Sequence, residues 1–191
     1  ESFFDLTGVV LSEAGIVDDV GYWPYRDTQK GIKLDGYAWN ALERVFCGII
    51  VDWSDEPNEL TYIPKKDIDT LGKRVSRYLE QAPTRKFRDS LDVSSPGLIP
   101  ADKLVNVKDE ILKYRVIVIT DNIIGDRVKN INIQPIDEKK TSIEIWDLER
   151  LMKLSLSSHE TEEFVVDLSE AKQSVQVIEA SRLDNGAVTY M

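Results

Sequence analysis

Cysteine and histidine are almost absent from this chain, which has one of each among its 191 residues. With only Cys47 available, a disulfide framework is excluded, and a reducing cytoplasm is the best fit. Cys47 lies in the apolar run VFCGIIV, where a cysteine is usually an unreactive core residue. His159 lies in the polar stretch SSHETEE. We therefore expect neither a Cys–His pair nor a Ser-His-Asp triad.

Several sequence motifs typical of ligand-binding or catalytic sites are also missing. The sequence contains neither GxGxxG nor GxxxxGKS/T, so a phosphate-binding glycine loop is not expected. It lacks CxxC, HExxH and GxSxG, which argues against a zinc site and against a nucleophile elbow. No apolar run approaches the roughly 20 residues that span a bilayer, and the N-terminus does not resemble a signal peptide. We expect a cytoplasmic protein without a membrane segment.

The chain is acidic, with a formal net charge of −10 and a pI of about 4.7. Self-repulsion on this scale favours solubility and argues against broad non-specific binding of nucleic acid. One stretch, GKRVSRYLEQAPTRKFR, is locally basic. We interpret it as a solvated helix face, with a nucleic-acid surface as the alternative. Its basic residues are Lys73, Arg74, Arg77, Arg85, Lys86 and Arg88.

The periodicity of apolar residues predicts helices interleaved with strands. Two strands, 31–39 and 45–53, are expected to form a hairpin through NALER, and YRVIVITD reads as a buried strand. GYWPYRDTQKG is expected to be a loop because Pro24 interrupts it. This order favours an α/β fold with a mixed sheet flanked by helices. Helices are expected at 2–15, from 67 to Pro83, at 101–111 and at 147–158, and further strands at 130–137, 141–146, 163–169 and 175–181.

No repeat or break in composition divides the chain, so a single domain over residues 1–191 is expected. The sequence begins at Glu1 and stops in AVTYM, which reads like an unfinished strand. We interpret the chain as an excised domain, whose first partner is the remainder of its own protein.

The predicted hairpin and the helix before it carry candidate residues for metal-dependent cleavage of nucleic acid. Magnesium-dependent cleavage of a phosphodiester uses two or three oxygen ligands on the metal, and a lysine that orients or activates water. Glu13 on the first helix, Asp35 on the first strand and Asp52 on the second occur in a suitable order, with Lys33 two residues before Asp35. Asp35 and Asp52 share a face only if Asp35 pairs with residue 50.

Five stretches occur in order along the chain: GVVLSEAGIVDDVGY, GIKLDGYAWN, GIIVDWSDE, YRVIVITD and IEIWDLERLMKLSLSS. Through them the chain resembles the N-terminal region of the abortive-infection phage-resistance (AIPR) proteins, which are long bacterial proteins. The D-G-Y strand and the W-D-L-E-R start of a helix are the most specific elements of this resemblance. Some relatives have a D-G-(Y/F) strand followed by a strand ending in Q-x-K, which looks like a PD-(D/E)XK nuclease core. The resemblance implies a restriction-endonuclease-like fold and a role in phage defence.

The chain departs from that pattern at the second strand. Where relatives have Q-x-K, it reads Ile50-Val51-Asp52, and an aspartate cannot supply the positive charge of a lysine. Lys33 could direct a cation at the same place, or it could simply pair with Asp35. We therefore expect a degenerate site, with Asp35 paired with Lys33, hydrogen-bonded to backbone, or solvated.

Three functions stay open from the sequence. The first is a degenerate nuclease-like domain that needs no cofactor and acts in recognition or as a structural module. The second is an active Mg²⁺-dependent nuclease in which Glu13, Asp35 and Asp52 bind the metal and Lys33 assists. The third is a protein-interaction domain without a role in nucleic-acid chemistry.

Two local roles are also predicted. Asp147 is expected to cap the helix that follows it. The aromatic residues around the first strand are expected to pack in the core, with a stacking surface for bases or a protein as the alternative. These aromatic residues are Tyr22, Trp23, Tyr25, Tyr37 and Trp39.

Overall fold

The computed structural model describes residues 2–54, 61–125, Val128 and 131–159, together with two short strands near the C-terminus. The chain forms two compact units, Glu1–Glu160 and Thr161–Met191, and each is described by itself. The expectation of a single domain over residues 1–191 stays a prediction.

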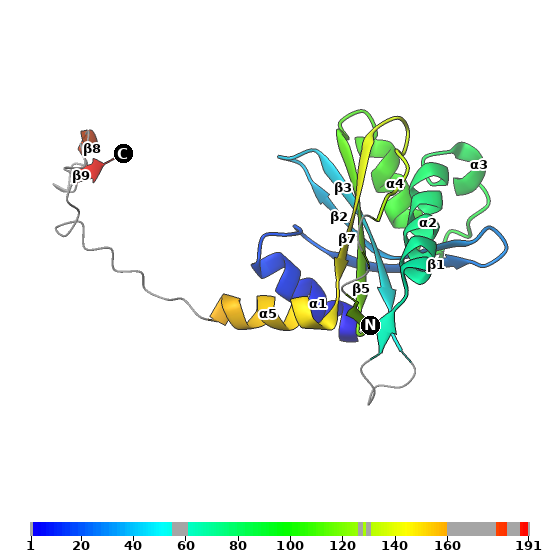
Figure 1. The fold of residues 1–191 in the computed structure, drawn as a ribbon. Helices are drawn as coiled ribbons and strands as arrows, with labels where there is room; N and C mark the ends of the chain where they lie inside the picture. The colour runs from blue at the N-terminus through cyan, green and yellow to red at the C-terminus, as the bar shows by residue number, and fades with distance from the viewer. Residues whose placement is uncertain are drawn as a thin grey trace. The chain divides into compact units, whose positions relative to one another are not determined.

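A five-stranded mixed sheet, in the order β1-β2-β3-β5-β7, forms the centre of the first unit (Figure 1). β1, β2 and β3 are antiparallel neighbours, whereas β5 runs parallel to β3 and β7 parallel to β5. The predicted α/β fold with a mixed sheet flanked by helices is confirmed, and it is compatible with a restriction-endonuclease-like fold. The strands are β1 (Gly21–Asp27), β2 (Ile32–Asn40), β3 (Val45–Asp52), β5 (Lys113–Thr120) and β7 (Lys140–Trp146), while β4 (Tyr62–Ile63) and β6 (Ile123–Ile124) pair separately.

Helices cover both faces of this sheet (Figure 1). One core lies beneath α2, α3 and α4, where Tyr78 and Leu104 pack with Phe46. The other lies beneath α1 and α5, where Phe4 and Leu151 pack with the opposite side of the sheet. No described helix is long and apolar enough to cross a membrane. The helices are α1 (Ser2–Glu13), α2 (Lys65–Gln81), α3 (Arg85–Arg88), α4 (Leu98–Val107) and α5 (Leu148–His159).

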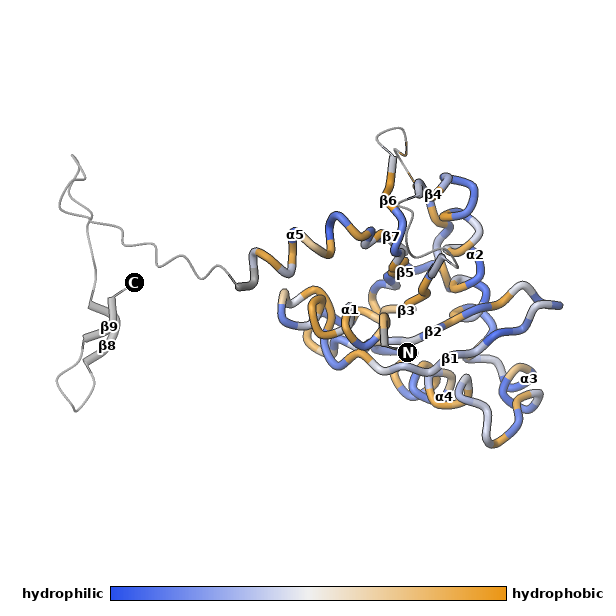
Figure 2. The backbone as a smooth tube through the Cα atoms, turned by 90° about the horizontal axis from the view of Figure 1, so that it is seen from below, coloured by the Kyte–Doolittle hydropathy of each residue, from blue (hydrophilic) through white to orange (hydrophobic). Residues whose placement is uncertain are grey.

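The central strands are hydrophobic because both of their faces are covered. β3 is buried from Val45 to Ile50 and β5 from Val116 to Thr120. Figure 2 shows these two strands as largely hydrophobic stretches between the helices. The prediction that YRVIVITD is a buried strand is confirmed.

The predicted hairpin of β2 and β3 is also confirmed, with Gly36 opposite Ile49 and Asn40 opposite Val45. Its turn contains Arg44 with a φ of 57°, a left-handed conformation that is uncommon for a residue with a side chain. The Arg44 Nε donates to the carbonyl oxygen of Glu110, and the Arg44 carbonyl accepts from the Leu112 N–H. These bonds hold the turn against the start of β5.

Two local predictions were wrong. The segment expected to be a loop contains β1, because an edge strand tolerates Pro24 where a bulge interrupts the pairing with β2. The strand expected at 130–137 is not formed by its described part, in which residues 131–135 have no regular pairing and Ile136 makes one isolated bridge to Lys139. Its alternating pattern arises because Ile131 and Ile133 pack on the core without entering the sheet.

The second unit contains an antiparallel pair, β8 (Glu179–Arg182) and β9 (Val188–Tyr190). β8 overlaps the end of the strand expected at 175–181, and β9 agrees with the strand-like reading of AVTYM. The strand expected at 163–169 lies outside the described residues.

Cys47 is buried on β3, and burial raises the pKa of its thiol to about 12. The thiol therefore stays protonated at neutral pH, whereas the thiolate is the reactive form. We expect Ellman's reagent to label Cys47 negligibly in the folded protein and stoichiometrically after unfolding in guanidinium. Rapid labelling of the folded protein at neutral pH would contradict the burial.

Candidate functional site

Asp35 and Lys33 of β2 both bind the backbone of Val51 on β3. The Val51 N–H donates to Asp35 Oδ2 at 2.7 Å, and Lys33 Nζ donates to the Val51 carbonyl at 2.7 Å. Lys33 Nζ also lies 3.1 Å from Asp35 Oδ2, and only 8% of Asp35 is exposed. The expectation that Asp35 would be paired with Lys33 or bonded to backbone is confirmed in both respects. We name this arrangement of Lys33, Asp35 and Val51 the strand clamp.

The strand clamp occurs where the regular pairing of β2 stops. The ladder to β3 ends at Gly36 and Ile49, and in β1 the residues Trp23 and Pro24 together oppose Asp35. Val51 therefore lies beyond the last regular pair of the β2–β3 ladder. The side chains of Lys33 and Asp35 satisfy the N–H and the carbonyl of Val51 at this point.

The bulge also changes the direction of side chains along β2. Leu34 packs in the core under α2, whereas a Cβ on Gly36 would meet the ring of Phe4 on α1 and the carbonyl oxygen of Gly21. In a regular strand, residues two apart share a face. The alternation therefore breaks at Asp35, and only glycine fits at position 36.

Asp52 ends β3 and is held by the neighbouring strand. The hydroxyl of Thr120, a fully buried residue directly beside Asp52 in the β3–β5 register, donates to Asp52 Oδ2 at 3.2 Å. Thr120 Oγ1 accepts in turn from the N–H of Asn122. The sequence did not point to Thr120. Its only signal is a hydroxyl directly after the apolar run VIVI of β5.

Glu13, the third predicted ligand, is exposed at the end of α1. In the part of the chain that the structure describes, no three or more His, Cys, Asp or Glu side chains are placed to hold a metal ion together. The strand clamp brings Lys33 and Asp35 together, and Asp52 binds Thr120. Glu13, Asp35 and Asp52 are thus not grouped in this arrangement, and their metal-binding and catalytic roles stay predictions.

Further carboxylates at the carboxyl ends of the parallel strands hold the connecting segments. Asp121 accepts from the N–H and the hydroxyl of Ser54. Asp147 accepts from the Arg150 N–H through Oδ1 and from the Ile124 N–H through Oδ2, each at 3.0 Å. The prediction that Asp147 caps α5 is confirmed, and the bond to Ile124 adds a second role.

The aromatic residues around β2 pack on both faces of the sheet. Tyr37 stacks on Phe46 with ring centroids 5.5 Å apart, and Trp39 lies against the same ring. Tyr22 packs on Phe4. Tyr25 packs on Tyr78 and Phe87. Core packing, the first of the two roles expected, is confirmed for these four residues.

The basic stretch is divided into α2 and α3, with Pro83 between them as predicted. On α3, Arg85 pairs with Asp89 at 3.4 Å and Arg88 with Asp102 at 3.5 Å. On α2, the Arg77 guanidinium donates to the Gly31 carbonyl. No carboxylate of the described residues forms an ion pair with Lys73, Arg74 or Arg77.

Comparison with known proteins identifies the family. Residues 3–153 match the family described as the abortive infection phage resistance protein N-terminal domain. Neither the curated proteins nor the solved structures gave a match. The family match runs from α1 to α5 and therefore contains the whole five-stranded sheet. Because it spans well over half of the sequence, the chain belongs to the family of abortive infection phage resistance protein N-terminal domains, which implies a role in phage defence.

Proposed function

We propose that this domain serves phage defence as a nuclease-like module without nuclease activity of its own, acting in recognition or as a structural module. The observation that carries the proposal is the strand clamp, in which the candidate ligand Asp35 and the candidate cation Lys33 bind each other and the backbone of Val51. Both side chains thus have a structural role where a nuclease would need them for metal and substrate.

The second strand supports the same proposal. A metal-dependent nuclease of this kind needs oxygen ligands from neighbouring strands and a lysine that offsets developing negative charge. Position 52 supplies a carboxylate, and that carboxylate accepts from Thr120. For Lys33 to replace the missing lysine, it would have to leave both Asp35 and the Val51 carbonyl. Breaking a partly buried pair of this kind is costly because each charge loses its partner.

An active Mg²⁺-dependent nuclease is the alternative, favoured by the compatible fold and by the order of Glu13, Asp35 and Asp52 along the chain. It requires the strand clamp to open when metal and substrate bind. A single measurement, the metal-dependent cleavage of nucleic acid, distinguishes the two proposals.

We expect no cleavage of single-stranded or duplex DNA or RNA by the purified chain in the presence of Mg²⁺ or Mn²⁺. The measurement is electrophoresis of end-labelled substrates after extended incubation. Cleavage that needs the metal and disappears in both Asp35→Asn and Asp52→Asn, but persists in Glu149→Gln, would overturn the proposal. Activity unchanged in all three variants would identify a contaminating nuclease, and the expected result would stand.

A further inference from the structure

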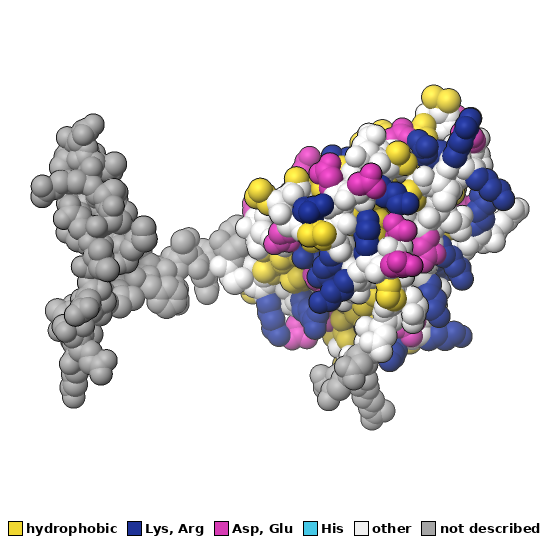
Figure 3. Space-filling view, turned by 90° about the horizontal axis from the view of Figure 1, so that it is seen from above, with side chains coloured by type: hydrophobic (Ala, Val, Ile, Leu, Met, Phe, Trp, Pro, Cys, Tyr) yellow, Lys and Arg dark blue, Asp and Glu magenta, His cyan; other side chains and the backbone are white. Residues whose placement is uncertain are grey.

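The positive charge of this acidic chain is concentrated on one part of its surface. Residues 65–88, which contain α2 and α3, hold eight Lys and Arg and three Asp and Glu, a net charge of +5 in a chain of −10. Figure 3 shows dark-blue Lys and Arg side chains along the side of the molecule on which Figure 1 places these two helices. A local field of this sign attracts polyanions even when the net charge is negative.

The two helices differ in how many of their cations form ion pairs. On α3, Arg85 and Arg88 each have a carboxylate partner, whereas Lys86 is exposed and has no ion pair with a described carboxylate. On α2, by contrast, Lys66, Lys73 and Arg77 are exposed and have no ion pair with any described carboxylate. Most of the unpaired positive charge of the two helices therefore lies on α2.

Lys66, Lys73 and Arg77 lie on one stripe of α2, because residues seven and four apart return to the same side of a helix. Eleven residues separate Lys66 from Arg77, which corresponds to about 16 Å along the helix axis. A stripe of this length can contact more than one phosphate of a nucleic-acid strand.

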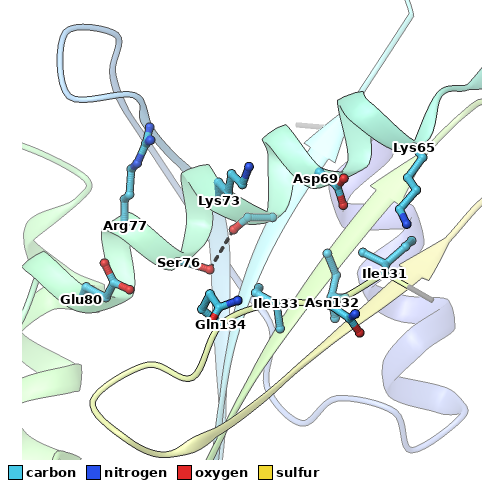
Figure 4. Close-up of a pocket in the computed structure, with 12 residues that line it drawn as sticks. Lys65, Asp69, Lys73, Ser76, Arg77, Glu80, Ile131, Asn132, Ile133 and Gln134 are labelled. Atoms are coloured by element: carbon cyan, nitrogen blue, oxygen red, sulfur yellow. Dashed lines mark hydrogen bonds between the residues drawn. The ribbon is translucent and has the colours of Figure 1, made fainter.

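A groove of about 460 Å³ lies beside this stripe, between α2 and the extended segment 131–134. In Figure 4, α2 forms one wall and the segment forms the other, and Lys65 reaches from α2 toward Ile131. Three isoleucines, Ile131, Ile133 and Ile143, and two exposed amides, Asn132 and Gln134, line the groove together with charged side chains of α2. Gly72 lets α2 approach β7 closely at the floor of the groove, because a Cβ there would lie 2.9 Å from Ile143 Cδ1.

The isoleucines and amides of the groove suit an unpaired base, and its cations suit the phosphates on either side of that base. Asp69 and Glu80 also line the groove and would repel a phosphate beside them, whereas Lys65, Lys73 and Arg77 would attract one. The apolar lining can cover the face of a base, and amides can bond its hydrogen-bonding edge. In a duplex that edge is already paired, so the groove selects a single strand.

We propose that α2 and segment 131–134 bind single-stranded nucleic acid, with phosphates along Lys66, Lys73 and Arg77 and a base in the groove. The proposal rests on the recognition role proposed above, and it uses a surface distinct from the strand clamp. Failure to bind would therefore refute this inference without restoring nuclease activity, and cleavage would refute the degenerate site without affecting this surface.

The test is fluorescence anisotropy of a labelled single-stranded oligonucleotide of mixed sequence, titrated with the full chain at several salt concentrations. We expect a dissociation constant of about 10⁻⁴–10⁻⁶ M at physiological salt. Lys73→Ala/Arg77→Ala should bind about tenfold more weakly, and its slope of log affinity against log salt should be smaller by about 1.4, since two phosphate contacts are lost.

The matched control is Arg85→Ala/Lys86→Ala, which removes the same charge from α3 and should leave the slope nearly unchanged. If the two double variants reduced the affinity and the salt slope equally, the proposed binding surface on α2 would be wrong. Binding would then reflect only the general positive charge of this side of the molecule. Asn132→Ala/Gln134→Ala should weaken binding of the single strand and not that of a duplex of the same sequence. If it weakens neither, the groove has no part in binding.

Discussion

Asp35→Ala is expected to lower the free energy of unfolding by about 2–4 kcal/mol, because it removes the acceptor of one partly buried group and the counter-charge of another. The Val51 N–H loses its acceptor, and the Lys33 ammonium, whose side chain is only 24% exposed, loses its counter-charge. Lys33 retains the Val51 carbonyl, which keeps the loss below that of a fully isolated charge. Urea denaturation followed by circular dichroism measures the change.

Asp35→Asn should cost less than Asp35→Ala, because an amide oxygen can still accept from the Val51 N–H although the ion pair is gone. The matched control is Glu149→Ala, which removes the partner of Lys153 in an exposed pair on α5 and should change stability by no more than about 0.5 kcal/mol. A double-mutant cycle of Asp35→Ala and Lys33→Met isolates the coupling. Should Asp35→Ala cost no more than Glu149→Ala, the strand clamp would not contribute to stability.

Asp147→Ala is expected to be at least as harmful, with a loss of about 2–4 kcal/mol from two separate effects. The first is the loss of the N-cap of α5, worth about 1 kcal/mol. The second is the loss of an acceptor for the Ile124 N–H, which costs a further 1–3 kcal/mol when the group is shielded from water. Only 4% of Asp147 is exposed, so water cannot easily replace either bond.

Thr84→Ala provides the comparison for Asp147→Ala, because Thr84 caps α3 through a single bond to the Phe87 N–H. That variant should lose only about 1 kcal/mol, the usual value for a cap. Asp147→Asn offers one acceptor oxygen in place of two and should fall between the wild type and Asp147→Ala. Equal losses in Thr84→Ala and Asp147→Ala would show that the bond to Ile124 contributes nothing.

Features with a local cause could be predicted from the sequence by itself. The hairpin of β2 and β3, the buried strand β5, the break before α3 and the cap at Asp147 all follow from residues a few positions apart. Apolar periodicity and capping depend on near neighbours, so the sequence shows them directly. The family resemblance rested on the same local patterns, and from it we expected a restriction-endonuclease-like fold.

Only the tertiary structure decided what the candidate residues bind. The groups that hold Asp35 and Asp52 lie 16 and 68 residues away along the chain, at Val51 and Thr120. Whether Pro24 ended a strand or lay in a bulge depended on β1 becoming an edge strand beside β2. Contacts between distant residues depend on register and on how the strands pair, and one sequence does not specify these. The chain could therefore be assigned an α/β fold from its sequence, whereas the structural use of Asp35 required the sheet to be formed.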